Sequence, residues 1–261
     1  MTSRFDPARA AAILQAHRRA GTTLAALPEG LAPQSRAEGY AAQAHWGEDA
    51  HLFGWKIAAT SAAGQAHIGV DGPMAGRIFR NTVTPDGGSC SLAGNGFRLA
   101  EPEFAFRFGR DLPPRAEPWR LEEVLAAVDT LHPAIELPDS RLADVARAGE
   151  AALIADNACA HGFTLGPAAP EGWRGLDLAA LRPLARVGAR HTREGLGAAV
   201  LGDPRTALAW LVNEVSALGL ALRAGAVVTT GTCCQPLDIE PGDRVEVDFG
   251  PVGAVSVFLT D

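Results

Sequence analysis

Residues 101–108 read EPEFAFRF, an alternation typical of a β-strand with two different faces. Side chains two apart on a strand point to the same side. The phenylalanines at 104, 106 and 108 therefore share one face, while Glu101 and Glu103 share the other. Three phenylalanines require a hydrophobic core. The stretch thus predicts a strand that buries an aromatic face and holds two carboxylates together on the opposite face.

The paired carboxylates allow two interpretations. On an exposed edge strand they would form a solvated acidic face, whereas inside the protein their repulsion would call for a hard divalent cation. A third carboxylate favours the cation, because Glu136 lies in an apolar run between Ile135 and Leu137, where an unpaired charge is costly to bury. Three glutamates, completed by water and substrate oxygens, predict an octahedral Mg²⁺ or Mn²⁺ site. Asp139 and Arg141 follow, either supporting this site or forming a surface ion pair.

Lysine use supplies a second unusual feature. The chain has 23 basic residues, and all but one are arginine; the exception is Lys56, between Trp55 and Ile57. Arginine stays charged in proteins, whereas the pKa of a lysine can fall on burial, so that it exchanges a proton near neutral pH. The single lysine in an apolar setting indicates either a catalytic ammonium or chance retention.

Composition excludes several classes of function. Hydrophobic residues make up 47% of the 261 positions, which is enough for a large core. A net charge of −7 and only 6% aromatic residues argue against nucleic-acid binding. We find no apolar run of the length that spans a membrane and no signal peptide in residues 1–12, and we expect a cytoplasmic protein. The four cysteines lack the spacing of a zinc site or a disulfide framework.

Periodicity along the chain predicts an α+β fold. We expect helices over residues 6–20, 35–51, 120–129 and 203–223, and a β-hairpin over 243–259. Between them, short apolar runs broken by Gly and Pro indicate strands. We therefore expect a helical N-terminal segment over residues 1–52 joined to a mixed β catalytic domain over 53–261, as one structural unit.

Several of these stretches resemble the 2-keto-4-pentenoate hydratase and 4-oxalocrotonate decarboxylase branch of the fumarylacetoacetate hydrolase superfamily. They occur in the family's order and span nearly the whole chain. The similar segments are GWKIAATS (54–61), GVDGPMAGRIF (69–79), EPEFAF (101–106), AIELPDSR (134–141), DNACAHGFTLG (156–166), GAAVLGDPRTALAWLVNE (197–214) and PGDRVEVDF (241–249).

The resemblance implies a mixed β-roll with an N-terminal helical part, a bound Mg²⁺ or Mn²⁺ and a homo-oligomer. The family's metal ligands correspond here to Glu101, Glu103 and Glu136, and its active-site lysine to Lys56. The turn at 229–232 is similar to the family's substrate-carboxylate loop, which implies that Thr232 binds substrate.

The implied reaction is the metal-dependent addition of water to a 2-hydroxy-2,4-dienoate, giving a 4-hydroxy-2-oxoacid in the catabolism of aromatic compounds. Hydratases of the family often carry an acidic residue in the turn that here reads Pro73-Met74-Ala75, and many read DNAS where this chain has DNAC at 156–159. The apolar turn leaves a 4-oxalocrotonate-type decarboxylase as an alternative. An acylpyruvate hydrolase would need a His–Glu pair that the sequence does not reveal. A non-catalytic metal-binding or scaffolding subunit is the remaining alternative.

Overall fold

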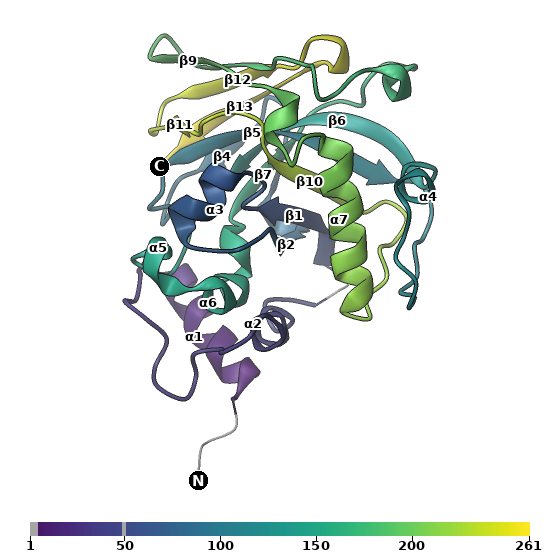
Figure 1. Cartoon of the computed structure of the whole chain (residues 1–261). Helices are drawn as coiled ribbons and strands as arrows, with labels where there is room; N and C mark the ends of the chain where they lie inside the picture. The colour runs from purple at the N-terminus through teal and green to yellow at the C-terminus, as the bar shows by residue number, and fades with distance from the viewer. Residues whose placement is uncertain (1–4, 49–50) are drawn as a thin grey trace.

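Two packed sheets and a set of helices form the fold of the computed structural model, which describes residues 5–48 and 51–261. The helices near the N-terminus lie at one end of the molecule and the second sheet at the other (Figure 1). The expected α+β class, a mixed β-roll with helices at its N-terminal side, is confirmed.

The first sheet contains the strand that the sequence singled out. In this sheet β1 pairs with β10 in parallel and with β2 in antiparallel fashion, so the sheet is mixed. Its order is β2-β1-β10-β5-β6-β7-β3, and β11 pairs with β5. The strands are β1 (Leu52–Ala58), β2 (Met74–Phe79), β3 (Val83–Pro85), β5 (Leu99–Phe108), β6 (Val128–Leu137), β7 (Gly162–Leu165), β10 (Val227–Thr232) and β11 (Leu237–Asp238).

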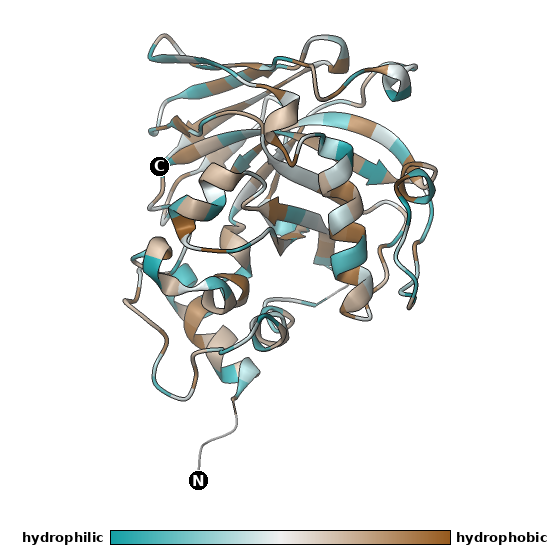
Figure 2. Cartoon of the chain, in the orientation of Figure 1, coloured by the Kyte–Doolittle hydropathy of each residue, from teal (hydrophilic) through white to brown (hydrophobic). Residues whose placement is uncertain are grey.

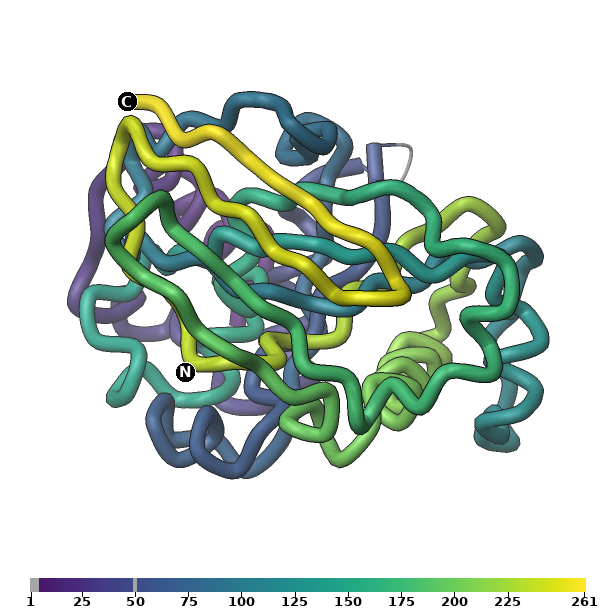
Figure 3. The backbone as a smooth tube through the Cα atoms, turned by 90° about the horizontal axis from the view of Figure 1, so that it is seen from above, coloured from purple at the N-terminus to yellow at the C-terminus, as the bar shows by residue number. Residues whose placement is uncertain are grey.

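The second sheet has the order β4-β13-β12-β8-β9. Its strands are β4 (Ser89–Ser91), β8 (Leu184–Val187), β9 (His191–Glu194), β12 (Arg244–Asp248) and β13 (Ala254–Thr260). The predicted hairpin over 243–259 is confirmed as β12 and β13, which lie side by side in Figure 3. Buried and exposed residues alternate along β12, and Figure 2 shows the matching alternation of hydropathy. One face of this sheet therefore meets the core while the other meets solvent.

The aromatic face of β5 joins the two sheets. Phe104, Phe106 and Phe108 are at most 1% exposed, as the alternation predicted. The ring of Phe104 packs edge-on against that of Phe249, at the end of β12, with centroids 5.0 Å apart. Because its aromatic face is used in this way, the glutamates of β5 lie on its other face.

Within the described residues, seven α-helices accompany the two sheets, and several of them pack on one another or on the first sheet. The α-helices are α1 (Pro7–Ala20), α2 (Arg36–Gln43), α3 (Ala62–Ile68), α4 (Leu121–Leu125), α5 (Val145–Ala148), α6 (Glu150–Ala155) and α7 (Pro204–Ala217). Short 3₁₀ turns are η2 (Arg80–Thr82), η3 (Asn157–Cys159), η4 (Trp173–Gly175), η5 (Gly197–Ala199) and η6 (Gly250–Val252). Helices α1 and α2 pack together and α2 packs on α6, while α7 contacts β10 and β2.

The helix predicted over 35–51 is shorter than expected. Helix α2 begins after the N-cap Ser35 and ends at Gln43, and positions 49–50 of the predicted range lie outside the described residues. Tertiary contacts end the helix: the indole N–H of Trp46 donates to the carbonyl of Ala155 at 2.7 Å. Gly47 then passes so close to Phe79 that a Cβ there would lie 2.6 Å from its ring.

The helices predicted over 120–129 and 203–223 are also shorter in the structure than expected. Helix α4 ends at Leu125 because Val128 already pairs with Phe108 in the sheet. Helix α7 ends at Ala217, and the chain turns at Gly219, whose φ of +74° suits glycine. After this turn, Leu222 forms an isolated β-bridge with Leu112. In both places, β-type pairing with a distant segment overrides the local helical propensity.

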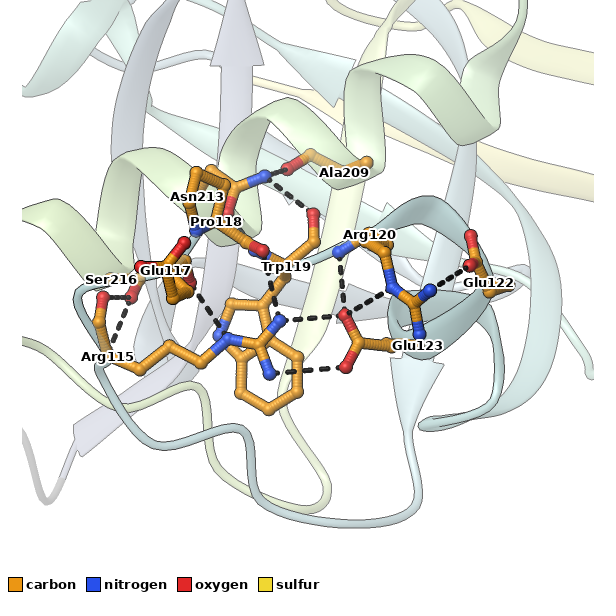
Figure 4. Close-up of polar contacts among 10 residues, drawn as sticks. All are labelled: Arg115, Glu117, Pro118, Trp119, Arg120, Glu122, Glu123, Ala209, Asn213 and Ser216. Atoms are coloured by element: carbon orange, nitrogen blue, oxygen red, sulfur yellow. Dashed lines mark hydrogen bonds and ion pairs between the residues drawn. The ribbon is translucent and has the colours of Figure 1, made fainter.

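The segment before α4 is attached to α7 by side-chain contacts (Figure 4). The guanidinium of Arg115 stacks 3.6 Å from the ring centre of Trp119. The amide of Asn213 accepts from the backbone N–H of Trp119 at 2.7 Å and donates to its C=O at 3.0 Å. One side-chain amide on α7 thus satisfies both backbone groups of a residue far away in sequence.

No helix in residues 5–48 or 51–261 is both long and apolar enough to cross a membrane.

Replacing the N-cap of α7 should destabilise the protein. The Oδ1 of Asp203 accepts from the backbone N–H of Arg205 at 2.7 Å, which satisfies one free donor of the first turn. We expect Asp203→Ala to lower the free energy of unfolding by about 1 kcal/mol, measured by urea denaturation. The control is Asp129→Ala, at an exposed position of β6. A loss no larger than that of the control would contradict the capping role.

Candidate metal centre and active site

Three glutamates from neighbouring strands meet on one face of the first sheet. In the ladder between β5 and β6, Glu101 lies directly opposite Glu136, and Glu103 lies two residues further along β5. One carboxylate oxygen from each residue lies within 4.8 Å of the others. Glu103 and Glu136 are buried and Glu101 is partly exposed. The structure therefore brings the three predicted ligands together, with one side open to the outside.

The hydrogen bonds of the cluster leave oxygens free to bind a cation. The Oε2 of Glu103 accepts from the hydroxyl of Thr229 and from the backbone N–H of Gly231, the latter at 2.8 Å. The other oxygen of Glu103 and the Oε2 of Glu136 are buried without a hydrogen-bond partner among the described residues. Buried carboxylate oxygens without donors are unusual. Their grouping fits a hard divalent cation, which prefers oxygen ligands.

Electrostatics support the same conclusion. Burial, followed by repulsion from Glu136, raises the pKa of Glu101 to about 7. Burial and the two neighbouring carboxylates raise the pKa of Glu103 well above its usual range. Burial also raises the pKa of Glu136, although the charge of Lys56 opposes the change. The three carboxylates thus resist being charged together, and a divalent cation would remove that penalty.

Lys56 lies beside the triad. Its ammonium Nζ lies 3.0 Å from Oε1 of Glu136 and donates to the carbonyl of Ala158 at 3.1 Å. Burial alone lowers the pKa of Lys56, but the charges of Glu136, Glu101 and Glu103 raise it by more. The sequence suggested only that the pKa of a buried lysine can fall; here the three nearby carboxylates oppose that effect of burial.

Thr232, the predicted substrate-binding residue, lies at the end of β10 opposite Glu103. The segment 229–232 is thus the end of a strand with an irregular register, and Gly231 in it has a φ of +97°. The hydroxyl of Thr232 donates to the carbonyl of Cys234 at 2.8 Å. Thr229, which the sequence did not single out, reaches Glu103 instead.

The segment Pro73-Met74-Ala75 is less of a turn than the sequence suggested. Met74 begins β2 and pairs with Ala58, while Gly76 pairs with Lys56. Residues two apart share a face, so Met74 and Gly76 face the same side as Lys56. Met74 is fully buried. The face of β2 that Lys56 shares is therefore apolar at Met74.

Asp139 and Arg141 form a buried ion pair, so the surface alternative for them was wrong. His161 lies near this pair, with its Nδ1 3.9 Å from Oδ2 of Asp139. Burial, together with the charges of Arg18 and Arg141, lowers the pKa of His161 to about 3, so its ring is neutral at physiological pH. The sequence missed this histidine, because its neighbours come from distant segments.

A cavity of about 670 Å³ reaches the triad at Glu136. Other lining residues include Asn157, His161, Arg18, Arg19 and Arg80. Within the described residues, Arg19 and Arg80 have no acidic partner. Cavities of this size commonly bind small molecules, and the basic residues favour an anionic one.

Comparison with known proteins agrees with the fold and with the kind of site. The family model "Fumarylacetoacetate (FAA) hydrolase C-terminal" matches residues 74–257. A 2-keto-4-pentenoate hydratase of Paraburkholderia xenovorans (strain LB400) is 35% identical over 204 residues, covering 78% of this chain and 74% of the relative. The 2-keto-4-pentenoate hydratase 2 of Dechloromonas aromatica (strain RCB) is 32% identical over 269 residues, covering 99% and 100%.

A solved structure agrees over nearly the whole length. The 4-oxalocrotonate decarboxylase of Pseudomonas putida G7, complexed with magnesium and adipate, superposes with a TM-score of 0.85 and 25% identity, covering 97% of each chain. The range matched by the family model includes the positions of the three glutamates. The chain belongs to the fumarylacetoacetate hydrolase family.

Removing one carboxylate should weaken metal binding. We expect Glu103→Gln to reduce Mg²⁺ affinity by at least about tenfold, because the change removes a charged oxygen ligand, as measured by isothermal titration calorimetry. In the wild type, Mg²⁺ at 100 times its Kd should stabilise the fold by about 2.7 kcal/mol. The control is Glu246→Gln, at an exposed position of β12. Equal Mg²⁺ affinity in both variants would exclude Glu103 as a ligand.

Proposed function

We propose that this protein is a lyase of the hydratase type. It adds water to a 2-hydroxy-2,4-dienoate, such as 2-hydroxypenta-2,4-dienoate, to give a 4-hydroxy-2-oxoacid in the breakdown of aromatic compounds. The observation that carries the proposal is the buried triad of Glu101, Glu103 and Glu136 with Lys56 at 3.0 Å. The two hydratases reported above support the choice of reaction.

The triad would hold Mg²⁺ or Mn²⁺, since its oxygen donors suit either ion. When bound, such a cation supplies Lewis-acid stabilisation of the negative charge that develops on the 2-oxygen of the substrate. Thr229 and Gly231 donate to Glu103 and keep its carboxylate oriented. These two donors leave the second oxygen of Glu103 available as a ligand.

Lys56 would carry a proton to the carbon skeleton. Its side chain lies beside Glu136 as an ammonium, the form that can donate a proton. Protonation of the dienol at C5, with loss of the proton of the 2-hydroxyl group, gives the conjugated 2-oxo-3-enoate. Water then adds its hydroxyl group at C4 and a proton at C3. A positioned general acid of this kind contributes roughly 10²–10⁴ in rate.

The substrate would enter through the cavity that ends at Glu136. Arg19 and Arg80 lie on its lining and attract a carboxylate. Thr232, at the end of β10 beside Glu103, would contact the carboxylate of the substrate. We also propose a homo-oligomer, which size-exclusion chromatography with light scattering would measure.

A 4-oxalocrotonate-type decarboxylase is the second candidate, and one observation favours it. Met74, which pairs with Ala58 two residues along from Lys56 on the same face of the sheet, is buried and apolar. Decarboxylation of 2-oxo-3-hexenedioate uses the same stabilised enolate, but it needs no acidic group to position water. The Pseudomonas putida G7 structure has that enzyme's name and a very similar fold.

Two substrates separate these candidates from a non-catalytic subunit. We expect the protein with Mg²⁺ to remove the ultraviolet absorbance of 2-hydroxypenta-2,4-dienoate without releasing CO₂, forming 4-hydroxy-2-oxopentanoate detectable by mass spectrometry. Release of CO₂ from 2-oxo-3-hexenedioate, without hydration of the first substrate, would identify the decarboxylase. No turnover of either substrate with Mg²⁺ or Mn²⁺ would overturn the lyase proposal and favour the non-catalytic subunit.

The role of Lys56 has its own test. We expect Lys56→Met to lower kcat by roughly 10²–10⁴, and Lys56→Arg to lower it also, because arginine does not release its proton. Mg²⁺ binding should persist in both variants, since the three carboxylates remain. Full turnover by Lys56→Arg with unchanged metal affinity would show that the assigned role is wrong.

A further inference from the structure

The turn that contacts Lys56 has an unusual backbone. Between α6 and β7, the three consecutive residues Asn157, Ala158 and Cys159 have φ angles of +57°, +50° and +62°. Residues with a Cβ rarely adopt this left-handed conformation, and a run of three is unfavourable. Such a conformation persists only where surrounding contacts determine it.

Hydrogen bonds hold this turn from several directions. The Oδ1 of Asn157 accepts from the backbone N–H of Arg77 at 2.7 Å, and its Nδ2 donates to the C=O of Arg77 at 2.9 Å. The side-chain amide thus pairs with β2 as a neighbouring strand would. The carbonyl of Cys159 accepts from the N–H of Asp139 at 2.9 Å. Asp156, just before the turn, accepts from Ser140 and Arg141.

These hydrogen bonds fix the direction in which one backbone carbonyl group points. The C=O of Ala158 points at the ammonium of Lys56, 3.1 Å away. Lys56 also forms an ion pair with Glu136, which belongs to the triad. Of these two partners, only the Ala158 carbonyl lies outside the metal site.

Close packing couples the turn to the lysine. A Cβ on Gly76 would lie 2.5 Å from the carbonyl oxygen of Asn157 and 3.0 Å from both Cγ and Cδ of Lys56. The turn and the stem of the lysine therefore both pack over Gly76 and leave no room for a side chain there. A displacement of the turn would be transmitted to Lys56, because densely packed atoms leave no empty space that could absorb the movement.

We propose that Asn157 is a positioning residue for Lys56. By pairing with both backbone groups of Arg77, its amide holds the left-handed turn and so fixes the Ala158 carbonyl that orients the ammonium. The inference rests on the proposed function, in which Lys56 transfers a proton. It adds a residue that touches neither metal nor reacting carbon and acts on the geometry of the proton donor.

The kinetic test compares two asparagines that make the same kind of contact. Asn213 pairs with both backbone groups of Trp119 (Figure 4), and among the described residues it forms no hydrogen bond with the triad or with Lys56. We expect Asn157→Ala to lower kcat by about 10- to 100-fold, as misplacement of a catalytic group by about 1 Å does. KM and the Kd for Mg²⁺ should stay within about threefold. Asn213→Ala should destabilise the fold and leave kcat within about twofold.

A second variant guards against failure to fold. Asn157→Gly removes the amide but tolerates a positive φ, so the turn is not strained. We expect it also to lower kcat. If Asn157→Gly, or a folded Asn157→Ala, keeps the wild-type kcat, the positioning role is wrong.

Because the chain has one lysine, a second readout needs no substrate. Protein labelled with [ε-¹³C]lysine and carrying a lysine-free tag gives one lysine signal in carbon NMR. We expect both Asn157 variants to shift or broaden this signal, and Asn213→Ala to leave it unchanged. An unchanged signal in the Asn157 variants would overturn the inference. Absence of turnover by the wild type would refute the proposed function, and full turnover by an active Lys56→Met variant would refute the proton-transfer role of Lys56; in both cases the carbon NMR signal of the wild-type lysine still tests the contact.

Discussion

The mutual repulsion of three carboxylates within 4.8 Å is the constraint on which the centre of this protein depends. Glu101, Glu103 and Glu136 project from two adjacent strands into a largely buried space, where charge is costly. One lysine supplies a nearby positive charge, and a divalent cation would supply the rest. Hydrogen bonds from Thr229 and Gly231 to one oxygen of Glu103 fix its orientation. Burying three carboxylates together is unfavourable without a cation, and this same repulsion favours the binding of a divalent cation.

The fold meets this constraint by placing four charged side chains on three strands of one sheet. Strand β5 lies between β10 and β6, and β10 connects it to β1, which carries Lys56. The opposite face of β5 buries its phenylalanines, and Phe104 packs against Phe249, directly after β12 of the second sheet. A rigid hydrophobic layer thus supports a polar centre, so that the carboxylates have little freedom to move apart.

Much of the triad could be predicted from the sequence, because alternation along a strand is a local property. The acidic pair of EPEFAFRF and the isolated Glu136 pointed to the cation site before any fold was known. The predicted helices over 35–51 and 120–129 were too long, since Trp46 and Val128 make contacts with distant segments. The direction in which the pKa of Lys56 shifts could not be derived from the sequence, because it depends on how many carboxylates surround the ammonium.

The sequence by itself determined the two faces of β5, the composition of the metal site and the single lysine, because each follows from residue type and short-range periodicity. Only the tertiary structure decided which groups meet. The register of β5 against β6 sets Glu101 opposite Glu136, and the left-handed turn at Asn157 aims a carbonyl at Lys56. The reason is physical: strand register and a strained turn are selected by contacts between residues far apart in the chain, which no local pattern encodes.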